Sequence, residues 1–170
     1  MRPIVFLDID DVLAIGDVWT SSYVIRSFRP GGLPFLEEEW EALFAHDARR
    51  HLTRLHDQFF PQYVVSSSWS NYLSLENMQV VFEKTDLGFV ASELHRDWTT
   101  PKGHAPDRYA EISGWLIDHP DVTNFVVLDD ANSGHSLHGS KLHARTVFCT
   151  SNLGFDDEKR TEAERILLSS

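Results

Sequence analysis

The stretch that decides the fold is residues 3–13, PIVFLDIDDVL. Its first five residues form a continuous apolar run that is too short for a helix and rich in strand formers, which predicts a strand covered on both faces. Three carboxylates, Asp8, Asp10 and Asp11, follow within four positions. Negative charge crowded against the end of a buried strand needs a physical reason.

Short apolar runs that end in polar residues return three times along the chain. They span residues 63–65, before Ser66-Ser67-Ser68, residues 124–128, before Asp129-Asp130, and residues 145–149. Between them, apolar residues recur at spacings of three and four, as amphipathic helices require. We expect helices over residues 36–59 with one break, 75–84, 106–117 and 156–168. Strands that alternate with helices predict an α/β fold with a mainly parallel central sheet.

Two segments contain too much glycine and proline for long elements. Residues 14–35 contain both Gly16 and Pro34, and we expect a loop or a short hairpin flap there. Residues 96–106 are expected to form a second loop. Val90 is expected to begin or end a short additional strand.

Composition limits the classes of protein that fit. A chain of 170 residues with 42% hydrophobic content fits one domain over residues 1–170. The formal net charge of −11, from 26 acidic and 15 basic residues, argues against binding of a nucleic-acid duplex or a long strand. The single cysteine, Cys149, is expected in the core and suits a reducing compartment.

The N-terminal apolar stretch is too short for a secretory leader or an anchor. It spans only residues 4–7 before the acids begin, and no run along the chain approaches the roughly 18–20 apolar residues that cross a bilayer. We therefore expect a soluble cytoplasmic protein with no membrane partner.

The polar residues that follow the strands share one property, which is their place at a strand's carboxyl end. In a parallel sheet these ends meet at one edge, so Asp8, Asp10, Asp129 and Asp130 are expected to converge with the serines of residues 66–68. Carboxylates that share a small volume repel one another unless a cation lies among them or some are protonated. An oxygen-rich site suits Mg²⁺, and the hydroxyls and amides after the second strand suit a phosphate. Together they predict phosphoryl chemistry.

Three motifs make the chain resemble the haloacid dehalogenase (HAD) superfamily. Residues 8–13, DIDDVL, resemble its first motif; residues 65–67, VSS, its second; and residues 127–130, VLDD, its fourth. The third motif, a lone basic residue, corresponds to Lys102 or Arg108. The resemblance implies a Rossmann-like three-layer sandwich with a minimal cap, reduced to a small flap or insert at about residues 14–62.

The resemblance also implies roles for the carboxylates. Asp8 would be the nucleophile that forms an aspartyl phosphate. Asp10 would act as general acid and base, and its backbone carbonyl would bind the metal. With Asp8 and Asp10, Asp129 and Asp130 would complete the metal site. Asp11 stands where the family often has glycine, which adds a charge near the site.

The phosphate-binding residues are expected from the second and third motifs. A hydroxyl of Ser66 or Ser67 and a cation from Lys102 or Arg108 would hold the phosphoryl oxygens as they gain charge. Ser67 is preferred because Trp69 resembles the aromatic that follows the motif's hydroxyl by two places in some branches of the family. The sequence leaves Lys102 and Arg108 as equal candidates for that cation.

The leading function is a Mg²⁺-dependent phosphomonoesterase that works through an aspartyl phosphate. Its partner would be a phosphorylated substrate, either a small phosphate ester or the phosphorylated end of a larger molecule, a nucleic acid included. The alternatives are a phosphotransferase of the same fold and an inactive phosphate-binding module. A haloacid dehalogenase is disfavoured, because that branch lacks an acid at the position of Asp10.

Overall fold

The protein is built around a five-stranded parallel sheet. The computed structural model describes residues 2–16, 21–103 and 107–169. The strand order is β3-β2-β1-β4-β5, and every neighbouring pair is parallel. The strands are β1 Ile4–Leu7, β2 Gln62–Val65, β3 Leu94–Thr99, β4 Phe125–Asp130 and β5 Thr146–Cys149. The predicted α/β class with its central parallel sheet is confirmed, and β1 lies in the middle of the sheet.

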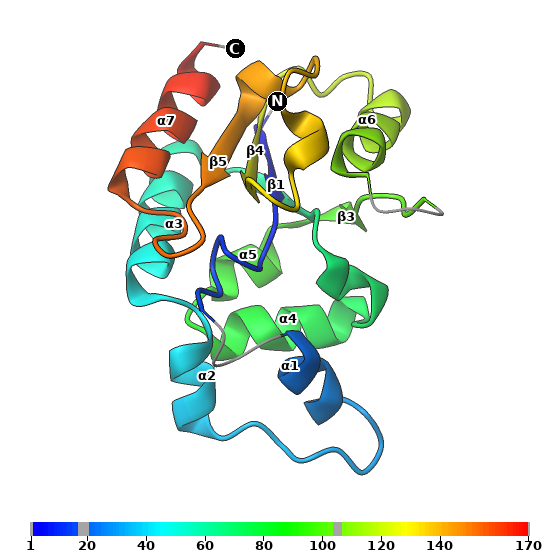
Figure 1. Ribbon diagram of the computed structural model, residues 1–170, viewed down its shortest axis with the longest axis vertical. Helices are drawn as coiled ribbons and strands as arrows, with labels where there is room; N and C mark the ends of the chain where they lie inside the picture. Colours follow the sequence, from blue (N-terminus) through cyan, green and yellow to red (C-terminus); the bar gives the residue numbers. More distant parts are fainter. Residues whose placement is uncertain (1, 17–20, 104–106, 170) are drawn as a thin grey trace.

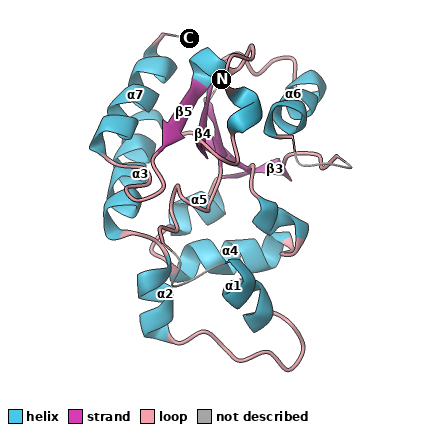
Figure 2. Cartoon of the chain, viewed as in Figure 1, coloured by secondary structure: helices cyan, strands magenta, loops and turns pink. Residues whose placement is uncertain are grey.

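Helices cover both faces of this sheet, which makes the predicted Rossmann-like three-layer arrangement (Figure 1). The α-helices of the described residues are α1 Ser21–Ser27, α2 Glu37–Leu43, α3 His46–Phe59, α4 Leu75–Lys84, α5 Gly88–Ser92, α6 Arg108–Asp118 and α7 Asp157–Leu168. Short 3-10 helices follow at η1 Ser68–Asn71, η2 His135–Leu137 and η3 His143–Arg145. α3 and α7 lie on one side of the strands and α6 lies on the other (Figure 2). Every helix in the described part of the chain is too short or too polar to cross a lipid bilayer.

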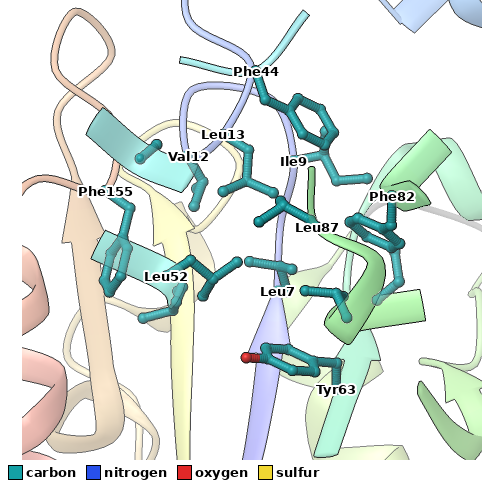
Figure 3. Packing of buried hydrophobic residues seen from close by; sticks show 14 of the residues in the cluster. Leu7, Ile9, Val12, Leu13, Phe44, Leu52, Tyr63, Phe82, Leu87 and Phe155 are labelled. Atoms are coloured by element: carbon teal, nitrogen blue, oxygen red, sulfur yellow. The ribbon is translucent and has the colours of Figure 1, made fainter. Parts of the chain in front are cut away.

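Alternation along β1 divides the core into two clusters. Successive strand residues point to opposite faces, so Val5 and Leu7 join the larger cluster, whereas Ile4 and Phe6 join the cluster that α6 covers. In the larger cluster, Leu7 lies between Leu52 on one side and Leu87 on the other (Figure 3). Because β1 is buried on both faces, Asp8, which follows it directly, lies next to an apolar environment.

The structure differs from the sequence predictions at the additional strand and in the two segments expected to be loops. Val90 lies in helix α5, and not at the end of a strand. The additional strand is β3, whose residues 96–99 lie in the segment that was expected to be a loop. β3 is an edge strand with exposed residues at its centre, so it lacks the apolar run that marks the other strands. Residues 21–27 form the short helix α1, which buries Val24 and Ile25. The remainder of the expected loop at residues 96–106 lies partly outside the described residues.

The other helix predictions are confirmed within two residues at each end. The break expected in residues 36–59 falls between α2 and α3, where Phe44 and Ala45 have extended or irregular backbone angles. α1, α2 and α4 lie beyond the carboxyl end of β1, apart from the layers that flank the sheet (Figure 1). Cys149 is buried, as expected.

We predict that Leu52→Ala lowers the free energy of unfolding by about 2–5 kcal/mol, because it opens a cavity at a fully buried position. Leu168→Ala is the matched control, since the Leu168 side chain is 71% exposed, and it should change stability by less than about 0.5 kcal/mol. Urea unfolding of both variants measures the difference. Equal effects would contradict the core assignment.

Candidate active site

Strand register brings the first and fourth motifs together. Leu7 on β1 pairs with Leu128 on β4, and the N–H of Asp8 donates to the carbonyl of Leu128 at 3.0 Å. Asp8 follows Leu7, and Asp129 follows Leu128, so the two aspartates are neighbours. One carboxylate oxygen from each of Asp8, Asp129 and Asp130 lies within 4.8 Å of the others, and all three residues are buried.

Asp10 lies at the start of a tight turn and lines the same pocket as Asp8. The carbonyl of Ile9 accepts hydrogen bonds from the N–H groups of Leu13 and Ala14, both at 2.9 Å. Asp11 sits in this turn with φ of 58°, a left-handed conformation that glycine adopts freely and that Asp tolerates better than most residues. This explains why a glycine is usual at this position in the family that the motif resembles. The indole N–H of Trp69 donates to Oδ2 of Asp10 at 3.0 Å and holds its carboxylate in place.

Arg108, the first residue of α6, points into the carboxylate cluster. Its guanidinium donates from Nε to Asp129 at 2.7 Å, from Nη2 to Asp8 at 3.4 Å and from Nη1 to Glu111 at 3.2 Å. Only 9% of the Arg108 side chain is exposed. The α6 N-terminus is fixed by Asp107, whose carboxylate accepts from the N–H of Ala110. Arg108 thus links Asp8, the residue directly after β1, to Asp129 of β4.

Lys102, the other candidate for the third motif, lies beside the same cluster. Its Nζ donates to the Ser67 carbonyl, to Oγ1 of Thr100 and to Glu111, each at 3.3 Å. The structure therefore brings both basic residues to the site, and each shares the carboxylate of Glu111. Arg108 is the one in contact with Asp8.

The two predicted serines are more deeply buried than the third serine of the same run. Ser66 and Ser67 are fully buried, and Ser68 is the one of the three that lines the open pocket. The Ser67 hydroxyl lies close enough to Asp8 to lower its pKa, although its geometry falls short of a hydrogen bond with any described residue. The sequence contained Ser68 in the same run, but nothing in the run distinguishes the three hydroxyls.

A pocket of about 350 Å³ lies beside the carboxylate cluster. Its lining includes Asp8, Asp10, Ser68, Lys102, Arg108 and Glu111. The sequence did not predict Glu111 as a site residue, because a single acidic residue in a helix is usually exposed to solvent. In the structure it is 8% exposed and pairs with both basic side chains, so its place is set by tertiary packing.

Burial dominates the protonation of the acids. It raises the pKa of Asp8 to about 7, against the lowering effect of the Arg108 guanidinium. Burial and the charge of Asp8 raise the pKa of Asp129 well above its ordinary value, again opposed by Arg108. The pKa of Asp10 is also raised by burial, in spite of the hydrogen bond from Trp69. Burial lowers the pKa of Lys102. The cluster therefore has more acidic groups than its two cations can keep ionised.

The donor atoms fit a hard divalent cation. Oδ2 of Asp8 and Oδ1 of Asp129 are buried and have no hydrogen-bond partner among the described residues. Carboxylate oxygens of this kind are the ligands that Mg²⁺ takes in proteins. Asp130 has another task as well, because its Oδ1 accepts from the N–H groups of Asn132 and Ser133 at 2.7 and 3.1 Å and holds the loop after β4.

Comparison with known proteins supports this assignment of the fold. A family model described as the HAD domain in Swiss Army Knife RNA repair proteins matches residues 4–159. That match covers β1 to the start of α7 and includes every predicted site residue. Searches of the curated proteins and of the solved structures found no match.

We predict that, in protein kept free of divalent cations, the ionisation of Asp8 makes a contribution to stability that becomes less favourable as the pH rises from about 4 to about 7. The folded state keeps a proton on Asp8 up to about pH 7, whereas the unfolded chain releases it near 3.8, so ionisation favours unfolding over this interval. The effect of Asp8 has an upper bound of about 4 kcal/mol. In Asp8→Asn this contribution is absent, so the variant should gain stability relative to wild type as the pH rises.

Thermal and urea unfolding in EDTA at pH 5 and pH 8 measure this difference. Asp57→Asn is the control, because Asp57 is exposed on α3, and it should follow wild type at both values. A stability difference between wild type and Asp8→Asn that is the same at pH 5 and pH 8 would count against the burial of an ionisable Asp8.

Proposed function

The chain belongs to the HAD superfamily, in the family of HAD domains of Swiss Army Knife RNA repair proteins, and on that basis we propose that it is a phosphomonoesterase that removes the phosphate from an RNA end. The observation that carries the proposal is the pair of buried carboxylates, Asp8 and Asp129, with unpartnered oxygens beside the guanidinium of Arg108. The proposed nucleophile, Asp8, and the proposed phosphate-binding cation, Arg108, line the same pocket.

Asp8 is proposed as the nucleophile. One of its carboxylate oxygens attacks phosphorus, an aspartyl phosphate forms, and the bond from phosphorus to the RNA oxygen breaks. Asp10 gives its proton to that leaving oxygen, a role that its raised pKa supports. Asp10 then takes a proton from water, the water oxygen attacks the aspartyl phosphate, and inorganic phosphate leaves with Asp8 restored as a carboxylate.

Asp8, Asp129 and the backbone carbonyl of Asp10 would hold Mg²⁺, with Asp130 as a further ligand directly or through water. When bound, the ion supplies positive charge that lets an anionic nucleophile approach an anionic phosphate. Asp129 is buried completely, so its carboxylate has no competing bulk water and stays aimed at the cluster.

The basic residues are proposed to bind the phosphoryl oxygens. Arg108 contacts Asp8 directly, which places its guanidinium next to the attacking oxygen. Lys102 and the hydroxyl of Ser67 or Ser68 would bind the remaining oxygens. Ser66 is the weaker candidate, because Ser67 is the serine whose hydroxyl lies close enough to Asp8 to lower its pKa.

An RNA end fits the charge of the protein better than a long strand does. The net charge of −11 disfavours contacts along many phosphates, whereas one terminal phosphate needs only the pocket. The segment over residues 14–62 contributes the two short helices α1 and α2 beyond the carboxyl end of β1 (Figure 1). We propose that this small insert leaves the pocket accessible to a macromolecule. Cytoplasmic location remains part of the same proposal.

We predict that the protein releases phosphate from RNA oligonucleotides phosphorylated at one end, in the presence of Mg²⁺ and with no release in EDTA. Asp8→Asn should lower kcat at least about 10³-fold, because it removes the nucleophile, while Asp57→Asn keeps wild-type activity. The assay compares 5′- and 3′-phosphorylated RNA with p-nitrophenyl phosphate and with the same RNA lacking a terminal phosphate.

Higher kcat/KM for one RNA end than for p-nitrophenyl phosphate supports the proposal in full. Hydrolysis of p-nitrophenyl phosphate alone would contradict the RNA substrate and leave the phosphatase mechanism standing. Phosphate binding without turnover of any substrate would instead indicate the inactive module.

We predict that Glu111→Gln lowers kcat/KM roughly ten- to a hundredfold. Glu111 holds both Lys102 and Arg108, and the loss of charged hydrogen bonds of about 1.5–3 kcal/mol leaves the two cations less well fixed. Glu83→Gln, at an exposed position of α4, is the control. A Glu111→Gln variant with wild-type KM and kcat would show that the two cations need no such support.

A further inference from the structure

A second group of potential metal ligands lies on the edge strand β3 and at the end of α6. His95 and Asp97 are two positions apart on β3, so their side chains leave the same face of the strand. His119 is the residue that caps α6 at its C-terminus. One ligand atom from each of the three residues lies within 4.8 Å of the others. None of them has a part in the proposed reaction.

The imidazole of His119 is oriented as a metal ligand usually is. Its Nδ1 lies 2.7 Å from the carbonyl oxygen of Trp115, and because a carbonyl only accepts, Nδ1 carries the proton. Nε2 lies 2.9 Å from Oδ2 of Asp97; without an ion it donates to that carboxylate, and on coordination it would release the proton and offer its lone pair. Metal-binding histidines in general donate their other N–H to a carbonyl or carboxylate in this way.

Trp115 fixes the plane of that ring. The indole stacks on the His119 imidazole with ring centroids 3.6 Å apart and an angle of 12° between the planes. Trp115 is itself 2% exposed, and its N–H donates to the carbonyl of Asp97 at 2.8 Å. The orientation of His119 is therefore held by a buried side chain that also binds β3.

His95 completes the group from the other side. Its ring meets the rings of Trp115 and His119 edge to face, at 5.0 and 5.1 Å, and its Nδ1 accepts from the N–H of Asp97 at 3.0 Å. Coordination through that nitrogen replaces one hydrogen bond. The side chain of Asp97 is half exposed, and Asp97 and His119 line a surface pocket of about 430 Å³, which leaves room for water on an ion.

We propose that His95, Asp97 and His119 bind one divalent transition-metal ion of the Zn²⁺ class. Two imidazole nitrogens and one carboxylate oxygen, with water as a fourth ligand, are a donor set that Zn²⁺ takes in an open tetrahedral site. Ligands about 2.0–2.1 Å from such an ion lie roughly 3.3 Å apart. The separation of 2.9 Å between Nε2 and Oδ2 therefore has to widen by only a few tenths of an ångström.

The ion would join two elements that meet at the edge of the sheet. β3 pairs with β2 alone among the strands of the described residues, and α6 carries Arg108 at its other end. A bond from the end of α6 to β3 would fix that helix against the sheet. The site requires neither Asp8 nor the phosphatase mechanism, so it stands or falls on its own test.

Calorimetric titration of the untagged protein with ZnCl₂, in excess Mg²⁺ to fill the carboxylate cluster, tests the proposal. We expect one Zn²⁺ per chain, and at least a tenfold loss of affinity in both Asp97→Asn and His119→Ala. His46→Ala is the control, because His46 is exposed at the start of α3, and it should bind as wild type does. Co²⁺ in place of Zn²⁺ should give the visible absorption of a tetrahedral site, lost in the same two variants.

Absence of Zn²⁺ binding by wild type, or equal affinity in wild type and Asp97→Asn, would overturn the proposal and leave an imidazole–carboxylate hydrogen bond with no metal function. Asp97→Asn decides the outcome if His119→Ala fails to fold, since Asp97 is exposed and its amide keeps the size of the side chain. Far-UV circular dichroism verifies the fold of each variant.

Discussion

The burial of adjacent carboxylates is the constraint on which the rest of this structure depends. The register of β1 and β4 places Asp8 next to Asp129 at the carboxyl ends of these two adjacent strands, and both residues are almost fully buried. Two like charges in that position stay ionised only with cations beside them. Arg108 supplies one positive charge, and the unpartnered oxygens of Asp8 and Asp129 leave a place for another. In the proposed chemistry, this excess of acidic groups over cations is what would bind the divalent ion.

Helix α6 connects that imbalance to the core. Arg108 and Glu111, three residues apart, lie on the side of the helix that faces the pocket. Ile112 and Trp115 follow along the buried side and pack in the cluster with Phe6. A rotation of α6 about its axis would remove the indole from the core and withdraw the guanidinium from the carboxylates at once. Packing of α6 against the core therefore also maintains the position of the Arg108 guanidinium beside the carboxylates.

Sequence reasoning worked where one local pattern decides the structure. Buried strands show continuous apolar runs, so β1, β2, β4 and β5 were found, together with the carboxylates at the ends of β1 and β4. It missed β3 because an edge strand has little apolar sequence, and it missed Glu111 because a buried acid differs from an exposed one only through its neighbours. The position of Ser68 at the pocket likewise depends on where the chain turns into η1.

The pairing of the basic residues also bears on which phosphate the pocket favours. Arg108 is shared by three carboxylates, and Lys102 by one of the same three, so little positive charge is left to attract a phosphodiester, which carries one negative charge. A terminal monoester carries up to two and gains correspondingly more from a bound cation at Asp8 and Asp129. It also has no second ester group to accommodate against the buried carboxylate. For the proposed phosphatase, charge and depth would together favour a phosphate at the end of a strand over one in its interior.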